Sequence, residues 1–295
     1  MAHNTLLWLS YKLRVPIDVL SELSQNAEAH YKEFTKTFKN GKVRPIECPD
    51  DKLMPVLKAV RAQLLVGIPL SAIVHGSRKG CSPLSNASQH VKAPSVASVD
   101  VKNFFPSVTN KMVYHVFTHI VGVGPDAAHV LTLLTTRNGH LPQGSPTSDA
   151  LANLFLDPVD REVEAIAEAL NLKATRYVDN YDFAGVRARE AIGPTIAALR
   201  AMRMAVRHKK TFNAGPRAAH VVTGLNVNGA RATTSRRARD SARIQVYAVI
   251  AARQRGLNTD IQERSLRGRL AQIGQTNPRF VVRMKRQLTS AGIDL

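Results

Sequence analysis

Cysteines, acidic residues and long apolar runs are scarce in this chain of 295 residues. Its two cysteines, Cys48 and Cys81, are far apart and lack the spacing of metal ligands. We therefore expect neither a disulfide framework nor a zinc site, and a reducing, cytoplasmic location. No apolar run reaches the roughly 18 residues of a membrane span, and the first residues do not resemble a signal peptide.

The shortage of acidic residues leaves a strongly basic chain. There are 41 Lys and Arg against 22 Asp and Glu, so the formal net charge is +19. Such a charge attracts a polyanion, and nucleic acid is the first candidate. A membrane surface is the second candidate, but no basic amphipathic helix stands out. Residues 231–295 hold 14 basic and four acidic residues, which predicts a segment that grips a nucleic-acid backbone.

Two hairpins and one long helix are the clearest local predictions. Residues 31–48 flank Asn40-Gly41, a strong turn signal, and residues 174–186 place Asp179-Asn180 at a second tip. The long helix spans about 146–170, with Ser145 as its N-cap. The other expected elements are strands at 96–101 and 219–227 and helices at 16–30, 51–67, 110–121, 125–136, 188–204 and beyond 235.

Two aspartates stand where metal chemistry is plausible. Asp100 ends the strand at 96–101, and Asp179 lies at the second hairpin tip. Both are embedded in apolar sequence, where an isolated carboxylate is costly to desolvate. A divalent cation removes that cost, and two Mg²⁺ ions can activate a primer 3′-hydroxyl and stabilise a leaving pyrophosphate. Taken singly, each aspartate is more often an ordinary residue of a strand end or turn.

Several segments, in a fixed order, resemble the motifs of reverse transcriptases. These are SVDVKNFFPSV at 98–108, LPQGSPTS at 141–148 and RYVDNYDFAG at 176–185. Two further segments, NASQH at 86–90 and VTG at 222–224, resemble elements associated with the retron enzymes of that group. The sequence is thus similar to retron reverse transcriptases over most of its length.

The resemblance implies an α+β fold of the right-hand polymerase type, with fingers, a palm of antiparallel sheet plus helices, and a helical thumb. We expect N-terminal helices and fingers in 1–95, the palm with interleaved fingers elements in 96–234, and a basic thumb in 235–295. The resemblance also implies that the enzyme copies part of its own structured noncoding RNA into single-stranded DNA. A guanosine 2′-hydroxyl of that RNA would be the primer, giving a branched RNA–DNA product.

The same resemblance assigns roles to individual residues. Phe105 would be a steric gate that excludes a ribose 2′-hydroxyl, while Phe104 belongs to the core. The implied ligands of two Mg²⁺ ions are Asp100, Val101, Asp179 and Asn180, and the implied nucleotide contacts are Lys39, Arg44, Phe105, Gln143 and Lys210. The implied RNA contacts are Asn86, His90, Val222, Thr223, Gly224, Arg267 and Arg269.

Each role has an ordinary alternative. The basic hairpin residues and Lys210, with Lys209 beside it, are also typical of a solvated surface. LPQGSP can simply be a loop that leads into a helix, and His90 a satisfied core histidine.

The second position of the turn departs from the family, which carries an aspartate where this chain has Asn180. An amide oxygen can coordinate Mg²⁺ but brings no negative charge. Asp182 faces the same side by strand alternation but lies a whole step away, so we do not expect it to replace the missing ligand. We expect an active enzyme that is slower or needs more metal.

Two rival interpretations remain open. One is a weakened or inactive homologue that binds RNA and an effector, and the other is a different class of bacterial defence reverse transcriptase. The NASQH and VTG segments argue against the other class, and the intact set of Asp100, Asp179, Phe105 and Gln143 argues against a pure binding module. An active retron-type reverse transcriptase therefore stays the preferred interpretation. Its expected partners are the noncoding RNA, the DNA product, deoxynucleotides and a separate effector protein of anti-phage defence, with no membrane involved.

Overall fold

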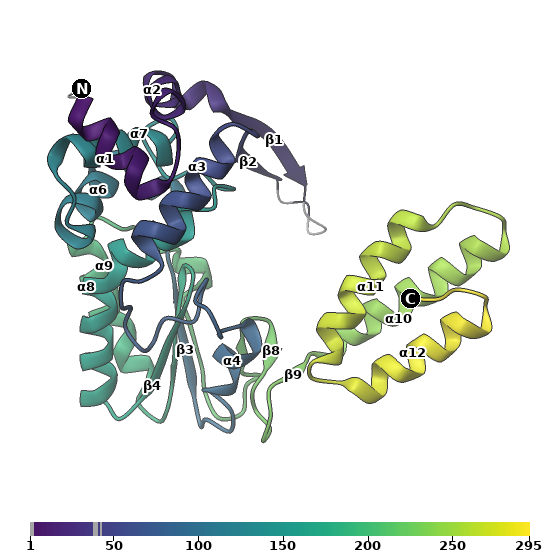
Figure 1. The fold of residues 1–295 in the computed structure, drawn as a ribbon. Helices are drawn as coiled ribbons and strands as arrows, with labels where there is room; N and C mark the ends of the chain where they lie inside the picture. The colour runs from purple at the N-terminus through teal and green to yellow at the C-terminus, as the bar shows by residue number, and fades with distance from the viewer. Residues whose placement is uncertain (1–2, 38–40, 42) are drawn as a thin grey trace.

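A computed structural model describes residues 3–37, 41 and 43–295 of the chain. Its elements form three groups: an N-terminal set of helices with a projecting hairpin, a central sheet backed by helices, and a C-terminal bundle (Figure 1). The N-terminal helices are α1 (His3–Leu13), α2 (Ile17–Gln25), α3 (Leu53–Val60), α6 (Asn110–His115) and α7 (Pro125–Thr135). Among residues 3–37, 41 and 43–295, none of the helices has the length and apolar character that a membrane span requires.

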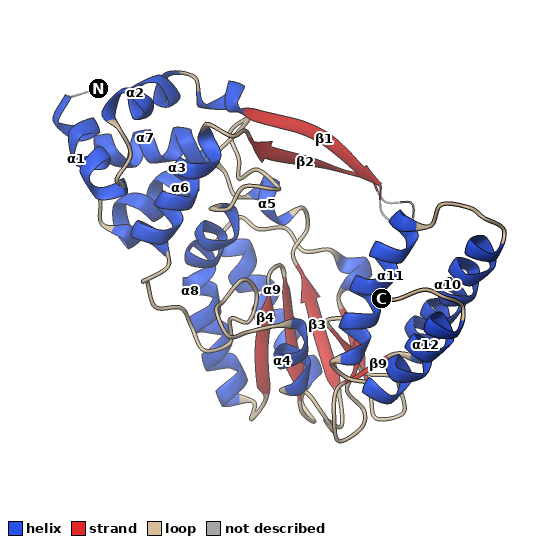
Figure 2. Cartoon of the chain, turned by 45° about the vertical axis from the view of Figure 1, so that its right-hand side comes forward, coloured by secondary structure: helices blue, strands red, loops and turns tan. Residues whose placement is uncertain are grey.

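The first predicted hairpin is confirmed. Strands β1 (Tyr31–Thr37) and β2 (Val43–Pro49) pair antiparallel, and they project from the N-terminal helices (Figure 2). Residues 38–40 and 42 of the turn lie outside the described residues, and so does Lys39, an expected nucleotide contact. Buried Tyr31 anchors the base of the hairpin, because its hydroxyl donates to the carbonyl of Leu134 on α7 at 2.9 Å.

The central sheet has four antiparallel strands in the order β4-β5-β3-β6. They are β3 (Val96–Asp100), β4 (Lys173–Tyr177), β5 (Asn180–Ala184) and β6 (Phe212–Ala214). Val99, Tyr181 and Phe183 point from one face into the main core, together with α8 (Ser148–Ala169) and α9 (Ile192–Ala201). The alternate residues face α4 (Pro83–Ser88), which is the short helix that carries the NASQH segment. The predicted α+β class with an antiparallel sheet is confirmed.

Two local predictions are wrong. The expected strand at 219–227 is a tight hairpin of β7 (Val221–Val222) and β8 (Leu225–Asn226), because Thr223 and Gly224 adopt positive φ angles of 45° and 79° and reverse the chain. Ser145 does not cap the long helix. Thr147 occupies that position, while Ser145 bonds to Thr147 within the turn before the helix.

Short helical turns account for other boundary differences. They are 3-10 turns at Ala27–His30, Ala188–Ala191 and His208–Lys210, π-helical turns at Arg61–Leu65 and Val116–Val121, and the single-turn helix α5 (Phe104–Ser107).

The C-terminal helices form a bundle with a core of its own. They are α10 (Arg236–Gln254), α11 (Asp260–Gly274) and α12 (Pro278–Ser290), joined to the sheet region through β9 (Thr233–Thr234). Val246, Leu266, Leu270 and Met284 are buried between the three helices. The bundle stands to one side of the sheet, and the β1–β2 hairpin extends toward that side (Figures 1 and 2).

Candidate active site

The turn between β4 and β5 has an unusual backbone. Its two loop residues are Val178 and Asp179, and Val178 has a φ of +59°. A β-branched residue is disfavoured in this left-handed region, at a cost of about 1–3 kcal/mol. Because the strain must be held by surrounding contacts, the position of Asp179 depends on its neighbours as well as on the hairpin. We call residues 177–180 the catalytic turn.

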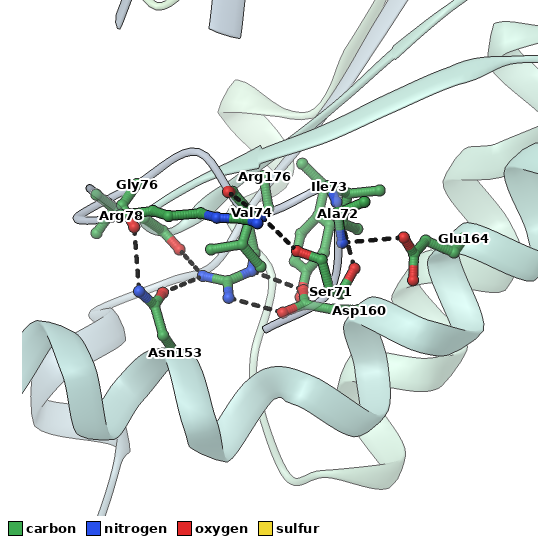
Figure 3. A network of polar contacts seen from close by, with 12 residues as sticks. Ser71, Ala72, Ile73, Val74, Gly76, Arg78, Asn153, Asp160, Glu164 and Arg176 are labelled. Carbon is green, nitrogen blue, oxygen red and sulfur yellow. Dashed lines mark hydrogen bonds and ion pairs between the residues drawn. The ribbon is translucent and has the colours of Figure 1, made fainter. Parts of the chain in front are cut away.

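Arg176 provides the most direct support for this turn. Its side chain is fully buried, and one nitrogen, Nη1, donates to the carbonyl of Val178 at 2.8 Å and to Oδ1 of Asn153 at 3.0 Å. Nε and Nη2 donate to the two carboxylate oxygens of Asp160 on α8 at 2.6 and 2.7 Å (Figure 3). The Tyr181 hydroxyl also donates to Asp160, at 2.9 Å. This bidentate pair ties the turn to the long helix.

The loop at residues 71–76 closes over the same turn. The backbone amides of His75 and Gly76 donate to the carbonyl of Arg176, and Asn153 donates to the carbonyl of Gly76 at 3.0 Å (Figure 3). A Cβ atom at Gly76 would lie 2.2 Å from the backbone nitrogen of Val178. Only glycine therefore permits this approach, and the loop braces the strained residue from outside.

Asp100 and Asp179 meet at this end of the sheet. Asp100 is the register partner of Asn180, and the Val101 amide donates to the carbonyl of Asp179 at 2.8 Å. The Asp100 side chain is nearly buried and has two cationic partners. Lys210 Nζ lies 2.6 Å from Oδ2, and Arg207 Nη1 lies 3.2 Å from Oδ1.

The structure thus adds Arg207 to the site that sequence reasoning outlined. Arg207 stands in a basic segment, so charge alone did not single it out. Its backbone amide donates to the carbonyl of Asp100 at 2.8 Å, which fixes it beside the carboxylate.

The charges at this site suit a divalent cation. Burial and the nearby Asp100 carboxylate raise the pKa of Asp179, while Lys210 and Arg207 lower it. Two carboxylates that repel each other in a partly dry site are stabilised by a cation. Across residues 3–37, 41 and 43–295, no three His, Cys, Asp or Glu side chains gather as a complete ligand set. The donors fit Mg²⁺, which keeps waters and substrate phosphates as ligands beside one or two carboxylates.

Asn180 and Asp182 form a polar cluster with Ser98 below the carboxylates. The Asn180 amide nitrogen donates to Oδ1 of Asp182 at 2.7 Å, and the Ser98 hydroxyl lies 3.0 Å from Asn180 Oδ1 and 2.9 Å from Asp182 Oδ1. Burial raises the pKa of Asp182 to about 7, against the opposing effect of these hydrogen bonds. The Asn86 amide lies close enough to lower that pKa slightly, without the geometry of a hydrogen bond.

Two cavities meet at the catalytic turn. We call the first, of about 720 Å³, the hairpin-side cavity, and the second, of about 560 Å³, the sheet-side cavity. Asp179, Lys209 and Lys210 line both. The hairpin-side cavity also has Val43, Arg44, Pro45, Asn103, Phe104, Phe105, Pro106, Gln143, Val178 and Arg207 in its wall. The sheet-side cavity is completed by Pro83, Ser98, Asp100, Tyr177, Asn180, Asp182, Phe212, Val221 and Thr223.

The hairpin-side cavity brings most of the expected nucleotide contacts together. Arg44, Phe105, Gln143 and Lys210 all line it, although they come from four separate segments. The LPQG loop is fixed against β2, because the Glu47 amide donates to the carbonyl of Gln143 at 2.9 Å. Gly144 has a φ of +142°, and a Cβ there would lie 2.9 Å from the carbonyl oxygen of Glu47.

The retron-like elements pack against each other on the face of the sheet that also carries the side chains of Asp100 and Asn180. Asn86 and His90 are completely buried, and His90 Nε2 lies 2.6 Å from the Thr175 hydroxyl. The Thr223 hydroxyl donates to the carbonyl of Pro83 at 2.7 Å, and Val222 is buried beside it. Direct contact with RNA is closed to the buried side chains in this conformation. Their role in RNA binding stays a prediction, which would act through the surface that they support.

A third cavity, of about 710 Å³, lies at the junction of β9 with the helical bundle. Five arginines from three separate segments reach it, so the sequence did not reveal the cluster. Its lining residues are Arg231, Arg239, Arg243, Thr276, Asn277, Pro278, Arg279, Phe280 and Arg283, and we call it the arginine cavity. The predicted contacts Arg267 and Arg269 lie on α11 instead, where Arg267 is exposed and Arg269 donates to Gln245 at 3.1 Å.

The structure has an antiparallel sheet that presents two carboxylates between two cavities, with helices behind it and a basic helical bundle beside it. This α+β arrangement is the one that the resemblance to right-hand nucleic-acid polymerases predicts. Comparisons with known proteins narrow this class. No protein-family model matches the chain. It is 28% identical to the retron Ec86 reverse transcriptase of Escherichia coli over 258 residues, which cover 85% of this chain and 79% of that protein.

Two relatives from Myxococcus xanthus agree. The retron Mx162 reverse transcriptase is 30% identical over 84% of this chain, and the retron Mx65 reverse transcriptase is 29% identical over 89% of it. The chain spans 58% and 65% of the lengths of these two proteins. The chain is therefore similar over most of its length to retron reverse transcriptases, which are RNA-directed DNA polymerases.

Among solved structures, a foamy viral protease–reverse transcriptase aligns with a TM-score of 0.46 and 15% identity. The alignment covers 82% of this chain and 35% of that one.

Proposed function

We propose that this protein binds a structured noncoding RNA and copies part of it into single-stranded DNA. The observation that carries the proposal is the meeting of Asp100 and Asp179 where two cavities join, with Lys210 and Arg207 beside them. The hairpin-side cavity would take the incoming deoxynucleotide, and the sheet-side cavity the 3′ end of the growing strand. The two cavities share Asp179, so both reactants would border the same carboxylate.

Asp100 and Asp179 would hold Mg²⁺, with the Val101 and Asn180 positions at the margin of the site. When bound, two such ions would activate the primer 3′-hydroxyl and stabilise the departing pyrophosphate. Lys210 and Arg207 now neutralise Asp100, at 2.6 and 3.2 Å. Because a cation at Asp100 would weaken those ion pairs, both basic side chains would become available to the triphosphate.

Selection of the sugar would rest on Phe105. This residue is partly exposed and lines the hairpin-side cavity, whereas Phe104 is 5% exposed and belongs to the core. A flat ring under the sugar leaves no room for a 2′-hydroxyl. Arg44 on β2 and Gln143 in the LPQG loop would contact the nucleotide from the opposite wall.

Recognition of the RNA would use charge and shape. Folded RNA is read mainly through phosphates, 2′-hydroxyls and overall shape, which suits a chain with net charge +19. We assign the gripping role to the bundle at 235–295 as the thumb, with 1–95 holding the fingers and 96–234 the palm. The separate core of the bundle and its arginine cavity support this division.

The experiment is primer extension with purified protein, an RNA template, a DNA primer, deoxynucleotides and Mg²⁺. We expect synthesis that falls by about a thousandfold or more in Asp179→Asn, because the site loses a charge that the transition state requires. Asp126→Asn is the matched control, since Asp126 is exposed on α7 away from the site. RNA binding without synthesis by the wild type would instead support a binding module, the alternative that Asn180 favours.

A further inference from the structure

The catalytic turn and strand β5 together hold two carboxyl groups, Asp179 and Asp182, the same number as a turn with two consecutive aspartates. Asp100 and Asn180 are register partners, and so are Ser98 and Asp182 one step further along. All four side chains, together with Asp179, line the sheet-side cavity. The carboxyl group that is missing at position 180 is therefore present two residues later, next to the amide.

The Asn180 side chain is held at both ends. Its nitrogen donates to Asp182 Oδ1 at 2.7 Å, and its oxygen lies 3.0 Å from the Ser98 hydroxyl. An ionised carboxylate only accepts hydrogen bonds, so in that form Asp182 orients the amide with its NH₂ group toward itself. When Ser98 donates to Asn180, one lone pair of the amide oxygen is left for another partner.

We propose that Asp182 is a positioning residue that holds Asn180, so that Asn180–Asp182 works as one unit and the metal charge is carried by Asp100 and Asp179. Asp182 lies at the floor of the cavity, 1% exposed, and it acts through the amide that it orients. Because Asn180 opens β5 directly after Asp179, fixing its side chain also fixes the end of the catalytic turn. The inference rests on the proposed polymerase function and names a further residue for it.

The hydrogen bonds among Ser98, Asn180 and Asp182 suit one carboxyl group and one amide at positions 180 and 182. A hydroxyl has a single proton, so Ser98 can satisfy only one acceptor at a time. In Asn180→Asp, two carboxylates would face each other with one shared donor. In Asp182→Asn, two amides would meet, and the group at position 182 that accepts the hydrogen bond from Asn180 would no longer be a carboxyl. The double variant Asn180→Asp/Asp182→Asn restores one carboxylate and one amide, with the hydrogen bond reversed.

The test is a double-mutant cycle on the full chain, read by primer extension at varied deoxynucleotide and Mg²⁺ concentrations and by thermal unfolding without Mg²⁺. We expect each single variant to lower kcat by about tenfold, with a smaller change in the KM for deoxynucleotide, since the reacting groups are displaced while the nucleotide contacts remain. The double variant should regain most of kcat and of the unfolding midpoint, and should reach half-saturation at less Mg²⁺ than the wild type.

Effects of the two substitutions that simply multiply, with no recovery in the double variant, would overturn the inference. So would an Asp182→Asn variant with unchanged kcat and unfolding midpoint. If the wild type makes no DNA, the proposed function is wrong, but the unfolding midpoints still decide whether residues 180 and 182 are coupled. Asp126→Asn controls for the loss of a carboxylate elsewhere.

Discussion

At the scale of single residues, the site depends on side chains that touch no substrate. Val178 is held at a φ of +59°, and Gly76 lies so close that any side chain there would collide with it. Strain of this kind persists only where surrounding contacts determine the conformation. The position of Asp179 is therefore set by the β4–β5 hairpin, by the loop at 71–76 and by the side chain of Arg176.

Phe105→Val should relax the choice of sugar. The smaller side chain opens the wall of the hairpin-side cavity, so incorporation of ribonucleotides should rise by about tenfold or more relative to deoxynucleotides. Primer extension with each nucleotide class measures the ratio. Phe117→Leu is the control, because that buried ring lies outside both cavities and should affect stability while leaving the ratio unchanged. An unchanged ratio in Phe105→Val would remove this residue from sugar selection.

His90 should make stability depend on pH. Burial lowers its pKa from 6.5 to about 4, so the unfolded chain takes up a proton in this range while the folded protein does not. Stability from this residue is complete above pH 6.5 and falls as the pH drops toward 4, by up to about 3 kcal/mol. The raised pKa of Asp182 acts in the opposite direction.

The effect of His90 is therefore measured as the difference in unfolding free energy between the wild type and a variant without this histidine. Unfolding of the wild type and of His90→Gln by denaturant, at several pH values between 4 and 7, gives the two curves. We expect the gap between them to narrow as the pH falls, because only the wild type loses this contribution. Parallel curves would mean that His90 is protonated equally in the folded and unfolded states.

At the scale of elements, the catalytic hairpin is joined to α8 by a buried ion pair. Both side chains of Arg176 and Asp160 are completely buried. Removal of one partner leaves an uncompensated charge, so Asp160→Asn and Arg176→Met should each destabilise the protein by about 3–5 kcal/mol. Because Arg176 also holds the carbonyl of Val178, its loss should lower kcat further than the loss of stability explains.

Chemical denaturation and primer extension at low temperature separate these two effects. The exposed pair of Arg187 and Glu190 is the matched control, and Arg187→Met should cause no measurable change. A stable Arg176→Met variant with normal kcat would contradict the role that we give to this network.

The sequence predicted the elements better than their contacts. Strong local signals determined both long hairpins, since Asn40-Gly41 and the alternation around Asp179 specify turns and strands directly. The VTG segment was misjudged as a strand, because its tight turn needs a positive φ at a threonine, which sequence pattern does not reveal. Arg207 and the Asp182 cluster were beyond prediction, since they depend on which residues the sheet register brings together.

At the scale of the whole molecule, positive charge is concentrated where the fold can apply it to a nucleic acid. The basic bundle stands beside the sheet (Figure 1). The arginine cavity lies where the segment around β9 joins the bundle. Five arginines from three segments of the C-terminal region converge there, and none of the described residues that line the cavity is acidic. A phosphate backbone that leaves the active site toward the bundle would meet this surface.

Arg279→Gln/Arg283→Gln should weaken RNA binding and its dependence on salt. Each phosphate contact that is lost should lower the slope of log affinity against log salt by about one. Filter binding or fluorescence anisotropy with a structured RNA, at several salt concentrations, measures this slope. Arg187→Gln/Arg189→Gln is a control with the same charge change, placed beside α9. Equal slopes in both variants would mean that the arginine cavity contacts no phosphate.

The central claim is that Asp100 and Asp179 form the catalytic centre of an RNA-copying enzyme. The most direct measurement is to express the chain with the RNA encoded beside its gene, extract nucleic acid, treat it with RNase, and look for a single-stranded DNA. We expect one discrete DNA in the wild type that disappears in Asp179→Ala and persists in Asp126→Asn. Absence of DNA from the wild type, with RNA still bound to the protein, would contradict it.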